Sequence, residues 1–172
     1  MIETGNGEIV VFAEIAGPAW RAADIALEDT VTAAARAAVA GAGIPFPRGA
    51  ELGIRLTDDA EIRCLNREWR DRDTATNVLA FALNDTAAPG ADEGAPAVLG
   101  DIVIAYETCA GEARDQDKPL ADHLSHLVVH GALHLLGFDH EDAADAEAME
   151  ALERAVLDGL GVPDPYLDSE AA

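Results

Sequence analysis

The chain has few of the features that mark secreted and membrane-spanning proteins. Its 172 residues include two cysteines, Cys64 and Cys109, which are too few for a disulfide framework. They are typical of reduced thiols that pack as small apolar residues. No apolar run reaches the roughly 20 residues that span a bilayer, and the N-terminus has no basic segment followed by an apolar stretch. We therefore expect an unexported, cytoplasmic protein that makes no contact with a membrane.

Basic and aromatic residues are also scarce. Eleven Lys and Arg residues stand against 33 Asp and Glu residues, which gives a formal net charge of −22. Such a chain repels nucleic acid overall, because affinity for phosphate backbones depends largely on Lys and Arg. Aromatic residues make up 5% of the chain, so few rings are available for stacking on bases. Any intrinsic affinity for nucleic acid should therefore be weak.

The basic residues are unevenly distributed. Four arginines lie within ten residues, namely Arg63, Arg67, Arg70 and Arg72. Two interpretations stay open. Either the acidic excess is a generic solubilising surface, or the molecule is bipolar and its one basic patch marks where an anionic substrate binds.

Length and hydrophobic content predict one domain with a sizeable core. We expect this domain to span residues 1–165 and a frayed acidic tail to span residues 166–172. Residues 84–97, rich in Ala, Gly, Pro and Asp, are expected to form a mobile surface loop. Hydrophobic periodicity predicts strands at 8–16, 51–57, 77–83 and 98–106, and helices at about 29–42, 58–70, 107–116, 120–136 and 141–157.

Strands that alternate with helices predict an α+β (α/β-like) fold. We expect a small mixed four-stranded sheet packed by about five helices, one of them a zincin-like metal helix. The apolar runs suggest that several strands are buried on both faces. Asp29 or Thr30 is the expected N-cap of the first helix, and Asp58 and Asp59 stand at the start of the second.

The segment HGALHLLGFDH, from His130 to His140, carries the clearest chemical signal. His130 and His134 are four residues apart, which places both imidazoles on one face of the predicted helix. Gly137 stands where helices often end in the left-handed conformation, and a reversal there could bring His140 over the same face. Three imidazoles around one point form a catalytic-type zinc site with a fourth position open to water. The alternative is a set of histidines satisfied within a helix-loop core.

The same spacing occurs in the metzincin metallopeptidases, HExxHxxGxxH. There, the glutamate after the first histidine is the general base that activates the metal-bound water. The corresponding residue here is Gly131, so peptide hydrolysis by that mechanism is disfavoured. Water on a metal can ionise near neutral pH without a protein base, which leaves other hydrolyses open.

Three segments resemble the YbeY family, bacterial endoribonucleases linked to ribosomal RNA maturation. HGALHLLGFDH is similar to the family's HGxLHLxGYDH. LNREWRDRDTATNVLAF, from Leu65 to Phe81, is similar to LNxxYRxxDxPTxVLSF, and LGDIVIAYE, from Leu99 to Glu107, is similar to LGDIxIxxE. The segments follow one another in the expected order and cover most of residues 50–155.

The resemblance implies a metal-dependent, single-strand-specific endoribonuclease that acts in maturation of the 3′ end of small-subunit ribosomal RNA and in ribosome quality control. It implies that His130, His134 and His140 ligate one metal, with Zn²⁺ expected and other divalent transition metals also suited to imidazole. It assigns Arg70 as the functional arginine, because a guanidinium can hold two phosphate oxygens while negative charge develops. The implied partners are single-stranded RNA and the ribosome or its associated proteins.

The sequence leaves alternatives for the nucleophile and for the roles of Arg70 and Asp139. Either water or an RNA 2′-hydroxyl could attack the phosphorus. Arg70 could instead form a surface salt bridge with Asp71 or Asp73. Asp139 could orient a ligating imidazole or cap the next helix.

Two histidines outside the motif have no strong functional claim. His126 is better explained as a core or groove histidine than as a neighbour of the metal, and His123 as part of the helix surface. The chain also departs from the family pattern, which has Pro, Ser, Pro and Tyr where this sequence has Ala75, Ala80, Ala82 and Phe138. A catalytic contribution from the serine hydroxyl is therefore absent.

Two other functions remain possible. One is a metallopeptidase-like hydrolase, which the histidine spacing favours and Gly131 disfavours. The other is a non-enzymatic ribosome assembly factor with a structural metal. Three histidines argue against the second, because structural zinc sites are usually closed by four protein ligands.

Overall fold

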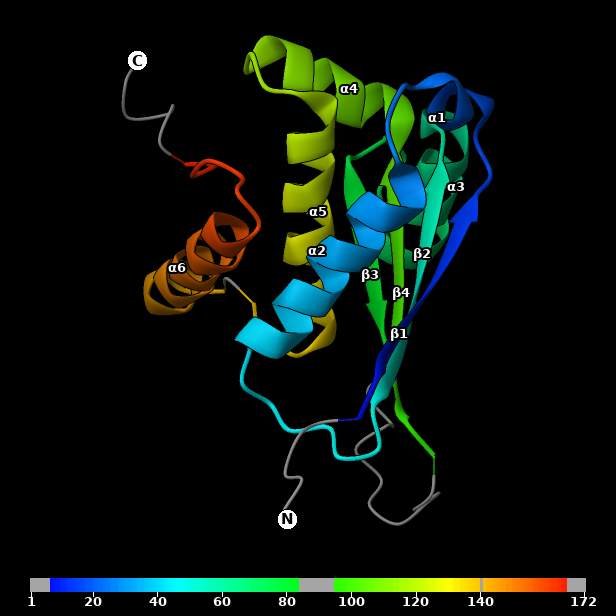
Figure 1. Ribbon diagram of the computed structural model, residues 1–172. Helices are drawn as coiled ribbons and strands as arrows, with labels where there is room; N and C mark the ends of the chain where they lie inside the picture. The colour runs from blue at the N-terminus through cyan, green and yellow to red at the C-terminus, as the bar shows by residue number, and fades with distance from the viewer. Residues whose placement is uncertain (1–6, 84–94, 140, 167–172) are drawn as a thin grey trace.

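The part of the chain that a computed structural model describes has four strands in one mixed sheet and six helices (Figure 1). The structure describes residues 7–83, 95–139 and 141–166. Within these ranges the elements are β1 (Ile9–Ile15), α1 (Pro18–Ala22), α2 (Leu27–Gly41), β2 (Ala50–Thr57), α3 (Asp59–Arg70), β3 (Val78–Ala82), β4 (Ala97–Ala105), α4 (Tyr106–Asp115), α5 (Leu120–Leu135) and α6 (Ala143–Gly159). The predicted α+β fold with a four-stranded sheet is confirmed.

The strand order is β1-β2-β4-β3. β1, β2 and β4 run parallel, and α1 and α2 form the helical crossover that connects β1 to β2. β3 pairs antiparallel with β4, from Val78 opposite Ile104 to Ala82 opposite Gly100. β3 is therefore an edge strand, and it also contacts α5.

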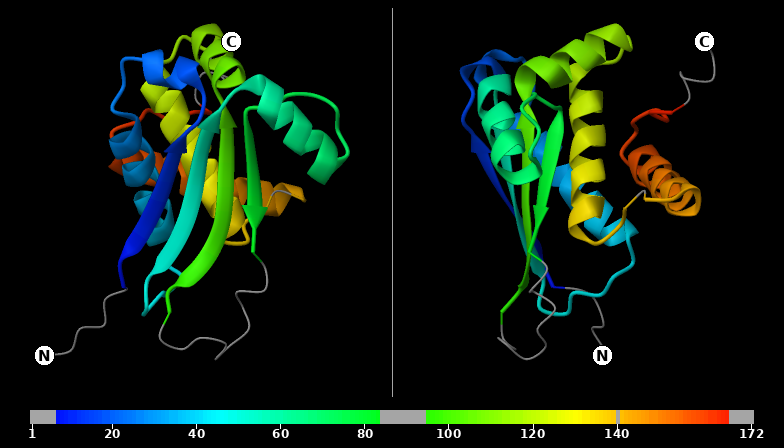
Figure 2. Two further views of the ribbon diagram at one scale, coloured as in Figure 1. Left: turned by 90° about the vertical axis from the view of Figure 1, so that its right-hand side faces the viewer. Right: turned by 180° about the vertical axis from the view of Figure 1, so that it is seen from behind.

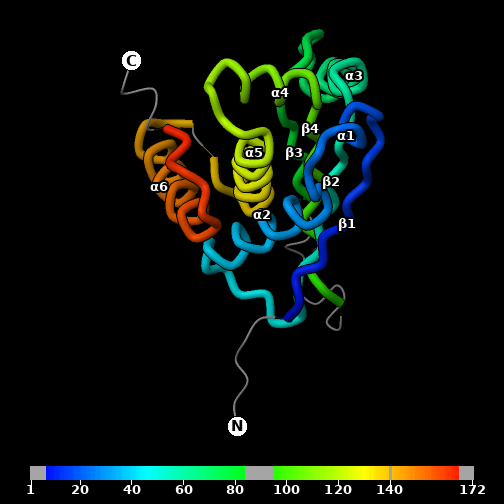
Figure 3. Tube along the Cα trace, turned by 45° about the horizontal axis from the view of Figure 1, so that its top comes forward, coloured from blue at the N-terminus to red at the C-terminus, as the bar shows by residue number. Residues whose placement is uncertain are grey.

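The helices are divided unequally between the two faces of the sheet. α2 and α5 cover one face, and α6 packs against them on the side away from the sheet (Figures 1 and 3). α3 lies on the opposite face beside β4 (Figure 2). The main core lies between the sheet and the α2–α5 layer, and its largest fully buried side chains include Trp20, Leu52, Ile54, Leu56, Ile102, Ile104, Leu124 and Leu133.

The expectation that several strands are buried on both faces is wrong for β1 and β2. Side chains of β2 alternate between buried and half-buried, and Phe12 of β1 is 58% exposed. The physical reason is that α3 covers only part of the second face. Burial on both faces is seen in the last four residues of β4, from Ile102 to Ala105.

The predicted strands and long helices occur with shifts of a few residues at their ends. Asp58 caps α3 as expected, because its side chain accepts a hydrogen bond of 2.9 Å from the Glu61 amide. The N-cap predicted for α2 is wrong: this helix begins at Leu27 after Ala26, which makes no side-chain cap hydrogen bond. The short helix α1 was not expected, since five residues give too little periodicity to recognise.

The segment after α6 packs back onto the domain instead of fraying where it begins. Lys118 Nζ donates to the Pro165 carbonyl at 3.2 Å, and the Tyr166 hydroxyl donates to Glu153. The rest of the predicted tail, 167–172, and residues 84–94 of the predicted loop lie outside the described residues. None of the helices that the structure describes combines the length and apolar content needed to cross a membrane.

Candidate metal centre

Helix α5 presents two of the three predicted metal ligands side by side. His130 and His134 are one turn apart, and their Nε2 atoms lie 3.1 Å from each other. The ring centroids are 4.6 Å apart and the ring planes are nearly perpendicular, at 77°. The helical spacing that the sequence predicted therefore brings both imidazole nitrogens to one point.

Gly131 lets α5 approach the sheet closely at this position. A Cβ atom placed on Gly131 would lie 2.9 Å from Cγ2 of Ile102 in β4, a distance too short for two carbon atoms. The backbone of α5 thus packs directly against a β4 side chain. As a result, His130 and His134 lie beside the edge strand β3.

The end of α5 has the reversal that the sequence predicted. Gly137 has a φ of +100°, in the left-handed region, and its amide donates to the His134 carbonyl at 3.0 Å. The Phe138 amide donates to the Leu133 carbonyl at 3.0 Å, which completes a Schellman-type end. His140 lies outside the described residues, so the convergence of the third imidazole stays a prediction.

The two nitrogens meet a simple test for a shared ion. Zinc binds imidazole nitrogen at about 2.0–2.1 Å, and two ligands of a tetrahedral ion are then about 3.3–3.4 Å apart. The 3.1 Å separation between the Nε2 atoms of His130 and His134 agrees with this value. Among the described residues, no third His, Cys, Asp or Glu completes a metal-binding group, and this includes both cysteines.

A buried carboxylate on α6 contacts one of the two imidazoles. Glu153 is 0% exposed, and its Oε2 lies 2.7 Å from Nδ1 of His130. Its Oε1 accepts a hydrogen bond of 3.0 Å from Nε2 of His126 and another from the Tyr166 hydroxyl. Burial alone would raise the pKa of Glu153, but hydrogen bonds from His126, His130 and Tyr166 outweigh it and hold that pKa at about 2. The carboxylate is therefore ionised at neutral pH.

Sequence reasoning missed Glu153, although a signal was available. The residue falls on the apolar stripe of α6, four residues after Met149 and three before Val156. An acidic residue on a buried helix face requires partners, because an unpaired buried charge is strongly unfavourable. That pattern alone would have marked Glu153 as a residue with a specific contact.

The remaining histidines of α5 are structural. His126 donates to Glu153, in agreement with its interpretation as a core or groove histidine. The expectation that His123 lies on the helix surface is wrong: it is 3% exposed, and its Nε2 lies 2.8 Å from Oε1 of Glu112. Helix α4 covers it, and this burial lowers the pKa of His123. The proposed capping role of Asp139 is also wrong, because Asp142 caps α6 through the Asp145 amide.

Arg70 stands at the end of α3 and reaches across to β3. Its Nη2 donates to the Ala80 carbonyl at 2.7 Å, and its guanidinium carbon lies 5.0 Å from the centre of the Phe81 ring. The alternative of a salt bridge with Asp71 or Asp73 is wrong, since Asp73 pairs with another arginine and no described carboxylate lies within ion-pair distance of Arg70. Two contacts therefore fix the guanidinium without neutralising its charge.

Arg70, His130 and His134 line the same cavity, which has a volume of about 590 Å³. The other lining residues are Trp69, Gly131 and the five residues of β3. Residues from α3, β3 and α5 thus bring one uncompensated cation and two metal-binding nitrogens together. This combination suits an anionic group such as a phosphate.

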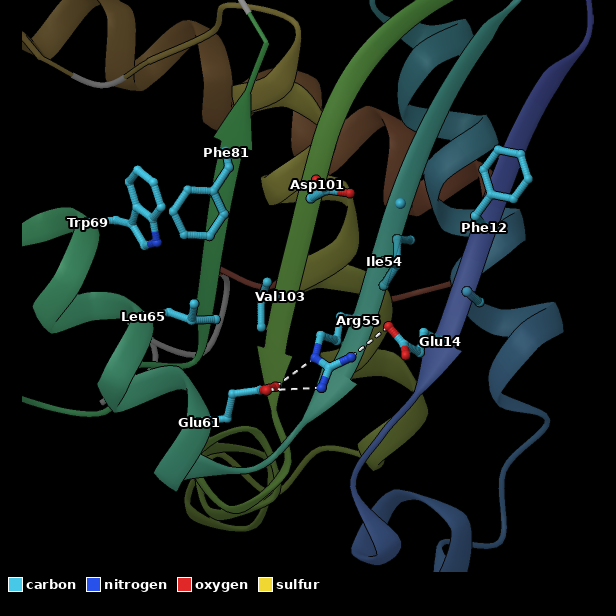
Figure 4. Close-up of a pocket in the computed structure, with 12 residues that line it drawn as sticks. Phe12, Glu14, Ile54, Arg55, Glu61, Leu65, Trp69, Phe81, Asp101 and Val103 are labelled. Atoms are coloured by element: carbon cyan, nitrogen blue, oxygen red, sulfur yellow. Dashed lines mark hydrogen bonds and ion pairs between the residues drawn. The ribbon is translucent and has the colours of Figure 1, made fainter.

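A second cavity of about 630 Å³ lies on the open face of the sheet, between α3 and β1 (Figure 4). Its arginine, Arg55, is held by Glu61 at 2.7 Å and by Glu14 at 2.6 Å, so its charge is already offset. The cavity is therefore poorly suited to an anion. Trp69 and Phe81 line both cavities and form the boundary between them.

Comparisons with known proteins identify the family of the chain. A sequence model of the family described as Endoribonuclease YbeY matches residues 21–161. The chain is 55% identical over 159 residues to Endoribonuclease YbeY of Azorhizobium caulinodans, which covers 92% of this chain and 96% of the relative. It is 52% identical over 161 residues to Endoribonuclease YbeY of Paramagnetospirillum magneticum, with the same two coverages.

Structural comparison gives the same fold at low sequence identity. The solution structure of TM1509 from Thermotoga maritima matches with a TM-score of 0.51 and 22% identity. The match covers 89% of this chain and 91% of that protein, so the likeness extends over nearly the whole fold. The level and extent of sequence identity, together with the family match, lead to one conclusion: this chain is a member of the Endoribonuclease YbeY family.

Proposed function

We propose that the protein is a metal-dependent, single-strand-specific endoribonuclease. In this proposal it acts in maturation of the 3′ end of small-subunit ribosomal RNA and in ribosome quality control. The names of the relatives support the reaction type. The observation that carries the proposal is the single cavity lined by Arg70, His130 and His134.

Each residue of the cavity has a distinct task in this proposal. His130 and His134 would hold the ion, together with His140. The ion, when bound, would supply a Lewis acid beside the scissile phosphate. Arg70 would bind phosphate oxygens through the N–H groups that do not bond to Ala80, and its charge would offset the negative charge that develops in the transition state.

The surroundings of the cavity favour an unpaired strand. Trp69 is 66% exposed and offers a ring face next to Arg70, and bases that are free of a duplex can stack on such rings. The net charge of −22 opposes tight binding to free RNA. We therefore propose that the ribosome or a ribosome-associated protein brings the RNA to the enzyme.

Two features argue against a peptidase. The contact between Gly131 and Ile102 leaves no room for the glutamate base of metallopeptidases at that position. Extended peptides often bind by pairing with an edge strand, and here Arg70 already occupies the Ala80 carbonyl of β3. A nuclease is compatible with both features, because phosphate recognition uses Arg70 directly.

Metal analysis combined with a nuclease assay on matched variants tests the proposal. His134→Ala should lose bound metal and RNA cleavage together, since it removes a ligand. Arg70→Glu should keep the metal and lose cleavage by about 10²–10³-fold, the effect typical of removing one transition-state donor. Arg63→Glu is the matched control, because Arg63 is on the same helix and pairs with Asp73 outside the cavity.

The same assay can contradict the proposal. RNA cleavage by a metal-free preparation would disprove the metal dependence. Cleavage that survives in Arg70→Glu at the level of the Arg63→Glu control would remove Arg70 from the reaction. Cleavage of peptides but not RNA would favour the metallopeptidase alternative.

A further inference from the structure

Glu153 divides its two carboxylate oxygens between different partners. Oε2 accepts a hydrogen bond of 2.7 Å from Nδ1 of His130. Oε1 accepts one of 3.0 Å from Nε2 of His126 and another from the Tyr166 hydroxyl. The Glu153 side chain is 1% exposed, so water does not compete for these positions. Oε2 thus contacts the candidate metal centre, and Oε1 contacts residues that pack α6 and the segment after it against α5.

The contact with His130 determines where the imidazole proton lies. An ionised carboxylate only accepts hydrogen bonds, so Nδ1 of His130 must carry the proton that joins it to Glu153. In the neutral ring, Nε2 then keeps its lone pair. That nitrogen is the one located 3.1 Å from Nε2 of His134.

From this geometry we propose that Glu153 is a positioning residue for the metal centre. It holds His130 in the Nδ1–H tautomer and fixes the ring so that the Nε2 lone pair points to the position shared with His134. A carboxylate behind a ligating histidine also raises the basicity of the ligand. The inference rests on the metal site of the proposed function and adds a residue from α6, outside the histidine motif.

A purely structural role for Glu153 makes a different prediction. In that case the carboxylate would only anchor α6 and the segment up to Tyr166 against α5. Removal of any of its three partners would then have similar consequences. The division of its oxygens allows the two roles to be separated, because among the described residues His126 and Tyr166 both contact Oε1 and only His130 contacts Oε2.

The test compares the Zn²⁺ affinities of three full-length variants, measured by competition with a chromophoric chelator. Glu153→Gln should weaken Zn²⁺ binding about 10–100-fold, because the Gln amide no longer provides a charged acceptor to Nδ1 of His130. His126→Phe and Tyr166→Phe, which leave Oε2 intact, should bind Zn²⁺ with nearly the wild-type Kd. All three should lower the Tm, since each removes a buried hydrogen bond.

A second measurement does not depend on a variant that folds or on bound metal. Nitrogen NMR of the metal-free wild-type protein should show His130 as the Nδ1–H tautomer. An Nε2–H tautomer would overturn the inference. Equal losses of Zn²⁺ affinity in all three variants, or no loss in Glu153→Gln, would also overturn it.

The two proposals fail in different ways. If the wild-type protein binds no Zn²⁺ or other divalent transition metal, the proposed function fails and the inference fails with it. If the wild-type protein binds Zn²⁺ and Glu153→Gln binds it equally well, only the positioning role is disproved. The nuclease assay on Arg70→Glu tests the contribution of Arg70 to RNA cleavage, and it can be interpreted whatever the effect of Glu153→Gln on Zn²⁺ affinity.

Discussion

Gly131 lies between the two histidines of the candidate metal centre and faces Ile102 of β4. In a helix interior, glycine is less favourable than alanine by about 1 kcal/mol. Its presence here is explained by the distance of 2.9 Å from its ideal Cβ position to Cγ2 of Ile102. The residue that distinguishes this motif from a metallopeptidase motif is therefore also one that the packing requires.

Gly131→Ala should destabilise the protein despite the better helix propensity of alanine. Overpacking a tight contact costs about 1–3 kcal/mol, which exceeds the gain of about 1 kcal/mol from propensity over most of that range. Thermal or denaturant unfolding measures the difference. Gly159→Ala at the end of α6 is the control, because its Cβ would meet nothing within 4 Å.

A double-mutant cycle identifies the cause of this effect. In an Ile102→Ala background the opposing side chain is gone, so Gly131→Ala should no longer cost stability. A penalty that persists in that background would show that contact with Ile102 is not the reason for the glycine.

At the scale of elements, two faces of α5 have different surroundings. One face supplies buried core residues such as Leu124, Val128 and Leu133. Another face lines the cavity with His130 and His134, beside the edge strand β3. The helix ends in the reversal at the left-handed Gly137, three residues before His140 in the sequence.

Gly137→Ala should weaken both stability and metal binding. Its Cβ would meet nothing within 4 Å, so the cost comes only from the φ of +100° and should be about 1–2 kcal/mol. For a chain of this length this corresponds to a drop in Tm of roughly 2–8 °C. A strained turn should also shift the approach of His140 and reduce Zn²⁺ affinity.

Gly43→Ala is the matched control for this prediction. Gly43 has a φ of +73°, its Cβ would also meet nothing within 4 Å, and it follows α2 instead of α5. Both variants should lose similar stability, and only Gly137→Ala should lose Zn²⁺ affinity. Equal Zn²⁺ affinities for the two variants would show that the turn at Gly137 does not direct a metal ligand.

At the scale of the whole molecule, the acidic excess dominates the electrostatics. A net charge of −22 on 172 residues repels itself within the compact state. Some of the arginines that could reduce this repulsion already form ion pairs with neighbouring carboxylates, as Arg55 does with Glu14 and Glu61. Arg70, by contrast, has no ion-pair partner among the described carboxylates, and it lies in the proposed active site.

Stability should consequently rise with ionic strength. Between about 0.01 M and 0.1 M salt the Debye length falls from about 30 Å to about 10 Å, which screens repulsion among exposed carboxylates. We expect the Tm in NaCl to rise over this range by a few degrees, at roughly 2–4 °C for each kcal/mol gained. A Tm that falls with salt would show that attractive ion pairs outweigh the net repulsion.

A variant with less negative charge provides the control for the salt effect. Glu68 and Glu147 are both exposed, and replacing each with Lys changes the net charge from −22 to −18, two units per substitution. The Tm of this double variant should depend less on NaCl than that of the wild-type protein. An unchanged dependence would point to an effect of salt other than screening.

Features that depend on residues close together in the sequence could be predicted, and features that depend on packing between distant elements could not. Helix periodicity placed His130 and His134 on one face, and the glycine after the helix predicted the reversal at Gly137, because both depend on nearby residues. The strands were found for the same reason. The burial of His123 was not predicted, since it depends on how α4 packs over α5.

The sequence by itself determined the local elements, the pair of imidazoles one turn apart and the family to which the chain belongs. Only the tertiary structure decided that Glu153, 23 residues after His130, stands behind that histidine, and that Arg70 lines the same cavity. Contacts of this kind depend on which helix faces pack together. Backbone periodicity fixes which residues share a face, and side-chain packing between distant elements fixes which faces meet.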